Sequence, residues 1–260
     1  MKNLQKQPNS PVSNESKVAG KMIEMTGLRK GFGTQEVLKD VSLKLFSGEN
    51  LVILGKSGSG KSVLIQCIVR LLIPDEGTIE VLGRDVNSLN KQELDELRKK
   101  IGFLFQGGAL YDSMTVKENL EFPLRRINKQ LTEKEIIEKV NEALENVGLA
   151  EALNKMPSQL SGGMRKRISL ARTIVVDPLI MLYDEPTTGL DPVTSDEISA
   201  LINEVQKKYK TASIIITHDI ECAKATADRI LMLQDGEVYK EGKIADFQHS
   251  NDPIIKSFFK

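Results

Sequence analysis

The amino-acid sequence predicts an α/β fold: a mainly parallel sheet core with an antiparallel β portion and an inserted helical subdomain. Two observations lead to this prediction. Strand-like apolar segments alternate with helical segments along most of the chain, which implies parallel strands covered by helices on both faces. A helical block at about residues 106–177 interrupts that alternation. The chain has 260 residues, which suits one large domain or two small ones.

The first half of the chain supplies most of the predicted strands. Residues 1 to about 20 are polar, and we expect a disordered tail there. A domain is expected over 21–243, followed by a C-terminal extension at 244–260. We expect strands at 22–26, 37–46, 51–54, 78–82 and 101–105. Helices are expected at 60–72 and 92–100.

Helical signals dominate the middle of the chain, and the α/β alternation then returns. Thr132 and Glu135 form a capping box in front of apolar residues at helical spacing. A further helix is expected from Ser161 to about Val176. Beyond it we expect strands at 179–183, 213–217 and 229–233, a helix at 192–209 and a short helix after 217.

Composition excludes several classes of protein. Lys plus Arg and Asp plus Glu both number 36, so no net positive charge attracts nucleic acid, and we expect no nucleic-acid partner. The longest apolar run, at 179–183, is far short of the roughly 20 residues that cross a bilayer. The N-terminal segment lacks the apolar core of a secretory signal. Cys67 and Cys222 are expected to be buried, reduced thiols.

A phosphate-binding loop is predicted between the apolar strand at 51–54 and the helix that follows. Residues 55–62 read GKSGSGKS and fit the pattern GxxxxGK[ST]. Glycines allow backbone N–H groups to point at phosphate oxygens, and the helix N-terminus adds partial positive charge. Lys61 is expected to reach the β- and γ-phosphates, and Ser62 to coordinate Mg²⁺. The expected nucleotide-binding residues here are Gly55, Ser57, Gly58, Ser59, Gly60, Lys61 and Ser62.

Two further strand ends supply candidate catalytic groups. The apolar strand at 179–183 is followed by Asp184 and Glu185, at the sheet edge where open α/β sheets bind ligands. We expect Asp184 to hold Mg²⁺ through water and Glu185 to deprotonate the attacking water. His218 ends the strand at 213–217 on the same edge and is expected to contact the γ-phosphate. Taken alone, an acidic pair at a strand end is often merely exposed to solvent and has no catalytic role.

The segment Leu160-Ser161-Gly162-Gly163-Met164 resembles the LSGGQ signature of ATP-binding cassette (ABC) ATPases. The resemblance covers about residues 22–242 and implies a P-loop NTPase fold of the ABC type. It also implies a head-to-tail dimer, in which Ser161, Gly162 and Gly163 complete the ATP site of the other copy. Met164 departs from the usual glutamine, which puts one polar contact to the opposing nucleotide in doubt.

Three other positions match the family pattern one at a time. Phe32 matches the aromatic residue that stacks on adenine, although a lone phenylalanine is more often part of a core. Gln106 matches the glutamine that senses Mg²⁺ and links the site to the helical subdomain. Asp191, in the segment Gly189-Leu190-Asp191, matches the loop that crosses the dimer interface.

Several segments of the chain are similar to the ATPase subunit of Mla-type phospholipid transporters. These segments are 105–124, the LSGGM sequence with the basic residues after it, and 183–191. The apolar residues after Gln106 would receive a helix of a membrane partner, or belong to the subdomain core; they are Ala109, Leu110, Tyr111 and Met114.

The function expected from this resemblance is ATP hydrolysis that energises phospholipid transport. It implies a second copy of the chain, a membrane-embedded permease and a lipid-binding accessory subunit, at the cytoplasmic face of the bacterial inner membrane. One alternative is an ABC transporter ATPase for an amino acid or a drug, which would share every catalytic residue. Another is a soluble ABC ATPase of iron–sulfur cluster assembly or nucleic-acid repair, against which the apolar stretch after Gln106 argues.

The C-terminal extension carries an apolar stripe at helical spacing, formed by Ile254, Ile255, Phe258 and Phe259. We expect it to pack on its own domain; the alternative is docking on a partner subunit.

Overall fold

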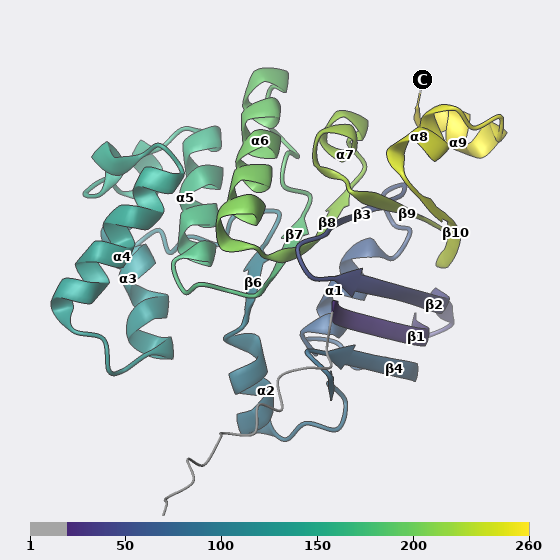
Figure 1. The fold of residues 1–260 in the computed structure, drawn as a ribbon, viewed down its shortest axis with the longest axis horizontal. Helices are drawn as coiled ribbons and strands as arrows, with labels where there is room; N and C mark the ends of the chain where they lie inside the picture. The colour runs from purple at the N-terminus through teal and green to yellow at the C-terminus, as the bar shows by residue number, and fades with distance from the viewer. Residues whose placement is uncertain (1–19, 260) are drawn as a thin grey trace, which may run out of the picture.

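The structure is a computed structural model that describes residues 20–259 (Figure 1). The disordered tail predicted for residues 1–20 lies outside the described residues, apart from Gly20. Two sheets form the centre of the described part, with helices α3, α4 and α5 gathered at one side and the C-terminal helices at the other (Figure 1).

The larger sheet confirms the predicted mainly parallel core. Its six strands lie in the order β10-β9-β3-β8-β7-β6. Neighbouring strands from β9 to β6 run parallel, and β10 pairs antiparallel with β9. Strands β3, β7 and β8 are buried along their whole length, as their unbroken apolar sequences require. The bounds are β3 Asn50–Leu54, β6 Ile101–Leu104, β7 Ile180–Asp184, β8 Ala212–Thr217, β9 Arg229–Gln234 and β10 Glu237–Gly242.

The smaller sheet is the antiparallel portion and has the order β2-β1-β4-β5. Strand β1 continues to Phe32 rather than ending near residue 26, because a register shift between Met25 and Leu28 turns Leu28 back into the core. The bounds are β1 Lys21–Phe32, β2 Gln35–Phe46, β4 Glu76–Val81 and β5 Arg84–Asp85.

Side chains on the two faces of the larger sheet enter two different cores. Leu51 and Ile53 of β3 pack in a cluster with the smaller sheet and with α1 (Lys61–Ile68) and α2 (Lys91–Arg98). Val52 and Leu54 point the other way, into a cluster with α6 (Pro192–Tyr209) and α7 (Ile220–Thr226). The strands that carry functional groups at their ends are therefore held from both sides.

One helix end and two strands also differ from the sequence prediction. Helix α1 ends at Ile68 instead of about residue 72, because Arg70 adopts a left-handed φ of 52° and donates hydrogen bonds to the carbonyls of Val86 and Leu89. Strands β5 and β10 were not predicted. Neither has an apolar run, and β10 alternates half-buried with exposed side chains at the sheet edge.

The helical block consists of α3 (Val116–Ile127), α4 (Glu133–Asn146) and α5 (Gly162–Ile174), with two short 3₁₀ turns between α4 and α5. The predicted capping box of Thr132 and Glu135 is present at the start of α4. Asn119 of α3 is fully buried. Its amide accepts a hydrogen bond from the Tyr111 N–H and donates to the Tyr111 and Met114 carbonyls, so it fixes the loop that enters the block.

The C-terminal extension folds back on the same chain as α8 (Ile244–Gln248) and α9 (Pro253–Phe258). Ile255 is buried, while the Phe259 ring centroid lies 6.0 Å from that of Phe247. Ile254 and Phe258 also pack against the core cluster of α5 to α7. The apolar stripe therefore covers its own domain.

Candidate functional site

The loop between β3 and α1 depends on glycine at both ends. Gly60 precedes α1 with a φ of 100°, and a Cβ added there would lie 2.7 Å from Leu38 Cδ2. A Cβ at Gly55 would lie 2.4 Å from the Leu233 carbonyl oxygen. Only glycine fits both positions, and the resulting bend leaves backbone N–H groups at the N-terminus of α1 free to face an anion.

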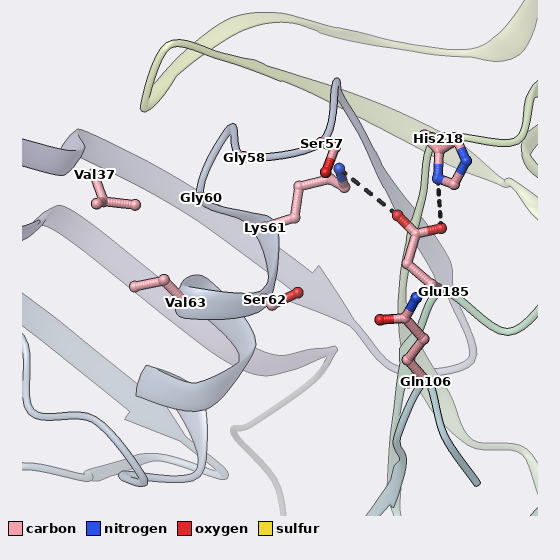
Figure 2. Close-up of a pocket in the computed structure, with 10 residues that line it drawn as sticks. All are labelled: Val37, Ser57, Gly58, Gly60, Lys61, Ser62, Val63, Gln106, Glu185 and His218. Carbon is pink, nitrogen blue, oxygen red and sulfur yellow. Dashed lines mark hydrogen bonds and ion pairs between the residues drawn. The ribbon is translucent and has the colours of Figure 1, made fainter. Parts of the chain in front are cut away.

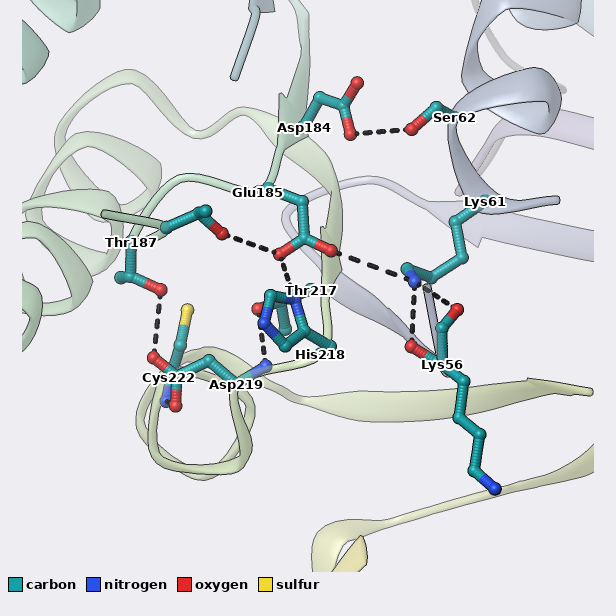
Figure 3. Close-up of polar contacts among 12 residues, drawn as sticks. Lys56, Lys61, Ser62, Asp184, Glu185, Thr187, Thr217, His218, Asp219 and Cys222 are labelled. Atoms are coloured by element: carbon teal, nitrogen blue, oxygen red, sulfur yellow. Dashed lines mark hydrogen bonds and ion pairs between the residues drawn. The ribbon is translucent and has the colours of Figure 1, made fainter. Parts of the chain in front are cut away.

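Lys61 holds a buried ammonium inside this loop. Its side chain is only 5% exposed, and Nζ donates to the carbonyls of Gly55 at 2.7 Å and Lys56 at 2.9 Å (Figure 3). Burial lowers the pKa of Lys61, while the nearby charge of Glu185 works in the opposite direction. The ammonium therefore lies where it can exchange carbonyl oxygens for the oxygens of a phosphate.

Asp184 and Glu185 end strand β7 opposite the loop. Ser62 Oγ donates to Asp184 Oδ1 at 3.0 Å, and Glu185 Oε1 lies 3.8 Å from Lys61 Nζ (Figures 2 and 3). Burial raises the pKa of Asp184, and the charge of Glu185 raises it further. The Glu185 backbone has a left-handed φ of 50° and donates its N–H to the Ile216 carbonyl at 2.9 Å.

The Glu185 carboxylate is also held from its other side. Its Oε2 lies 2.8 Å from His218 Nδ1 and accepts a hydrogen bond from Thr188 Oγ1 at 3.1 Å. Figure 2 shows the His218 ring above Glu185 and the Gln106 side chain below it. A carboxylate oriented in this way, in a non-glycine left-handed conformation, is typical of a strained functional site.

These groups line one cleft of about 300 Å³ (Figure 2). The predicted residues that the structure brings together there are Ser57, Gly58, Gly60, Lys61, Ser62, Gln106, Glu185 and His218. Val37 and Val63 also line the cleft. Sequence patterns did not indicate their position, because an apolar side chain at a site looks like any core residue.

Phe32, Gly55, Ser59 and Asp184 are predicted site residues that are not among those lining the cleft. Phe32 ends β1 as a residue that is 48% exposed, with the Lys30 ammonium 5.5 Å from the ring centroid. Gly55 and Ser59 belong to the glycine-rich loop itself, and Asp184 reaches the site through its hydrogen bond to Ser62.

Ser161, Gly162 and Gly163 lie at the start of α5, also away from the residues that line this cleft. The Ser161 hydroxyl accepts a hydrogen bond from the Met164 N–H and caps the helix. A Cβ at Gly163 would lie 2.6 Å from Thr194 Cγ2, so glycine allows α5 to approach α6 closely. Asp191 caps α6 by accepting from the N–H of Thr194, the residue whose side chain lies against Gly163.

Two polar residues near the site were not predicted. Thr188 orients Glu185, as described above, and Lys166 of α5 is buried and donates to the backbone carbonyl of Gln106 at 2.7 Å. A threonine four residues after a strand end, or a lysine in a basic stretch, carries no sequence signal of such a role.

None of the helices formed by residues 20–259 is both long and apolar enough to span a membrane.

Comparison with known proteins identifies the family. The family model described as "ABC transporter" matches residues 38–188. A dimeric ATP-binding cassette named MJ0796, solved in a post-hydrolysis state with ADP and phosphate, superimposes with a TM-score of 0.78 at 34% identity, covering 86% of this chain and 99% of that one. The cbiO1 protein of Clostridium perfringens, part of the transporter complex cbiONQ, gives 0.79 at 30% identity, covering 86% and 89%. The chain belongs to the ABC transporter family and is an ATP-binding ATPase of that family.

Curated relatives differ in the cargo that their names give. The probable ribonucleotide transport ATP-binding protein mkl of Mycobacterium tuberculosis is 40% identical over 246 residues, 95% of this chain and 68% of that protein. The protein TRIGALACTOSYLDIACYLGLYCEROL 3 of Arabidopsis thaliana is 37% identical over 264 residues, covering 95% and 75%. The methionine import protein MetN of Rhizobium johnstonii is 36% identical over 231 residues, covering 89% and 63%.

Replacing Asp184 by Asn will stabilise the ligand-free protein by about 1 kcal/mol at pH 7. A raised folded-state pKa means that the folded state disfavours the ionised carboxylate, so the penalty is full above that pKa and is lost as the pH falls toward the unfolded value of about 3.9. Thermal unfolding at pH 7 and pH 4 measures this, with a smaller gain at pH 4. Asp191→Asn is the control: hydrogen bonds from Thr194 lower the pKa of Asp191, so this variant will be destabilised. A destabilised Asp184→Asn protein at pH 7 would contradict the prediction.

Proposed function

We propose that this ABC ATPase energises a membrane transporter that moves phospholipids between membranes. It acts as two copies arranged head to tail at the cytoplasmic face of the bacterial inner membrane, with a membrane-embedded permease and a lipid-binding accessory subunit. Residues 21–243 form the ATPase domain, with its helical subdomain at about 106–177, and 244–260 form an extension. The observation that carries the catalytic part is the meeting of Lys61, Ser62 and Glu185 across one cleft.

The donors in this cleft suit a complex of ATP with Mg²⁺. Ser62 and Asp184 contribute hydroxyl and carboxylate oxygens 3.0 Å apart, and the Gln106 amide lines the same space. Mg²⁺ prefers such oxygen ligands and keeps several waters. We therefore assign Mg²⁺ binding to Ser62, Asp184 and Gln106. When bound, the ion neutralises negative charge on the β- and γ-phosphates.

Hydrolysis follows from the groups around Glu185. Its carboxylate takes the proton of the attacking water, and Thr188 and His218 hold it in the orientation that this requires. His218 uses Nδ1 for Glu185, which leaves its other ring nitrogen to contact the γ-phosphate. Lys61 stabilises the charge on the transferred phosphoryl group. Phe32, whose ring is half exposed at the end of β1, stacks on the adenine.

A second copy is needed because the signature residues do not line their own chain's cleft. Ser161, Gly162 and Gly163 begin a 13-residue helix, whose N–H groups and partial positive charge suit an anion. In a head-to-tail dimer they complete the ATP site of the other copy, with Asp191 at the interface. The dimeric MJ0796 cassette supports this arrangement. Met164 packs against its own core, so the altered signature position contributes apolar packing rather than a polar contact.

A separate groove of about 530 Å³ lies between α2, α3 and α5, and it suits a helix of the permease. Phe122 and Pro123 provide an apolar floor, and side chains of both charges surround it. The exposed Tyr111 ring packs edge-on against Phe122 and extends the apolar surface. Amphipathic helices bind in grooves of this kind. The cbiO1 protein, which is part of a transporter complex, supports a permease partner.

Support for a lipid cargo comes from the segments that resemble Mla-type ATPases and from one relative. The Arabidopsis relative carries the name of a galactolipid, while others carry the names of ribonucleotide or methionine transport. All of these would share the catalytic residues, so the cargo depends on the partners of this chain.

Glu185→Gln will bind ATP but hydrolyse it about 100-fold or more slowly, and will accumulate as a closed dimer. The amide keeps the shape of the side chain but cannot take a proton from water. Steady-state phosphate release and size-exclusion chromatography with ATP measure the two effects. Glu142→Gln, which changes an exposed carboxylate paired with Lys208, is the matched control. Near-normal turnover of Glu185→Gln would remove Glu185 as the base.

The cargo is tested by purifying the tagged protein from gently solubilised native membranes and identifying what accompanies it. We expect a multi-span permease, a lipid-carrying accessory subunit and bound phospholipid. A permease with a different solute-binding subunit would contradict the lipid proposal but not the proposed ATPase mechanism. Recovery with cytosolic partners alone would favour a soluble ABC ATPase.

A further inference from the structure

Helix α5 carries a buried ammonium that has no part in the mechanism above. The Lys166 side chain is 6% exposed, and Nζ donates to the Gln106 backbone carbonyl at 2.7 Å. Burial lowers the pKa of Lys166, while the charges of Asp184 and Glu185 oppose that shift. Among residues 20–259 it has no carboxylate within 4.0 Å, so its direct partner is the carbonyl.

Lys166 is the first of three contacts between α5 and the loop after Gln106. Lys166, Ser169 and Arg172 follow one another at three-residue spacing along the helix, and therefore lie along one side of it. A Cβ at Gly108 would lie 2.6 Å from Ser169 Oγ, so the loop runs close against the helix there.

At the far end of this row, Arg172 donates to the Ala109 carbonyl at 2.8 Å, and its guanidinium lies 4.8 Å from the Tyr111 ring centroid. The loop thus runs along one side of α5, from Gln106 at the ATP cleft to Tyr111 beside the groove of α2 and α3.

The loop needs such contacts because its own sequence does not define its path. Gly107 and Gly108 follow Gln106, and Gly108 and Ala109 both have left-handed φ values, 78° and 52°. Glycines lose more conformational entropy than other residues when they are fixed. Without an anchor at residue 106, the Gln106 side chain would sample positions outside the cleft.

We propose that Lys166 is a positioning residue for ATP hydrolysis: it ties the Gln106 carbonyl to the signature helix and so sets the Gln106 side chain in the cleft. The inference rests on the proposed role of Gln106. It adds that α5, whose N-terminus serves the other copy's ATP, also aligns the Mg²⁺ ligand of its own copy.

The test compares ATP hydrolysis and ATP binding in the full chain, purified with the membrane partners that it retains. Lys166→Met removes the donor and keeps most of the side-chain volume. We expect kcat to fall about tenfold or more, because a small misplacement of a site group is costly, with ATP affinity within about threefold of the parent. Lys166→Arg, which also donates to a carbonyl, is expected to recover most of kcat. Lys139→Met is the control, since Lys139 pairs with Asp177 outside the residues that line the cleft.

A double-mutant cycle separates positioning from general stability. In a Gln106→Ala background, Lys166→Met is expected to change kcat by less than about twofold, because the group that it positions is gone. Independent, multiplying effects would overturn the inference, as would an unchanged kcat in Lys166→Met. If Lys166→Met fails to fold, Lys166→Gln is measured in the same cycle with the same criteria. If Gln106→Ala alone leaves kcat unchanged, the proposed role of Gln106 fails instead.

Discussion

The approach of Lys61 to Glu185, 3.8 Å between Nζ and Oε1, is the contact on which the rest of the site depends. It joins the loop after β3 to the end of β7, and it exists because β8 alone separates these strands in the sheet. Burial removes charges from water, so each of these two buried groups needs the opposite charge beside it to offset that cost. Burial lowers the pKa of Lys61, so its ammonium depends on the Glu185 carboxylate beside it. That contact requires β3 and β7 to end at the same edge of the sheet. Thr188 and His218 hold the Glu185 carboxylate in place.

The sequence predicted the parts of this arrangement that depend on local chemistry. Glycine spacing in 55–62 predicted the loop, and the apolar runs before Asp184 and His218 predicted that both would end at the same sheet edge. Parts that depend on tertiary packing were not predicted. Whether Val37 or Val63 faces a cleft, and whether Lys166 is buried, depends on how α5 and β2 pack against neighbours far away in the chain. Strand β10 was missed because an edge strand needs no apolar run.

Helix α5 contributes both to the signature segment and to the path of the loop that leaves the ATP cleft. Its first turn carries Ser161 and the glycines of the signature, and it packs against α6 through Gly163 and Thr194. Its side holds the loop from Gln106 to Tyr111, which runs from the ATP cleft to the groove beside α2 and α3. A rigid element with a contact at each place is a physical route by which ATP binding and a permease can influence each other. The cargo itself leaves no mark on these residues.

The central claim is that each ATP site combines the loop of one copy with the signature of another. It is tested most directly by mixing two full-length variants that are each inactive, Lys61→Ala and Ser161→Arg. A mixed dimer contains one site in which both halves are intact, so the account predicts that ATP hydrolysis returns when the variants are combined. A mixture that stays as inactive as its two components would contradict it.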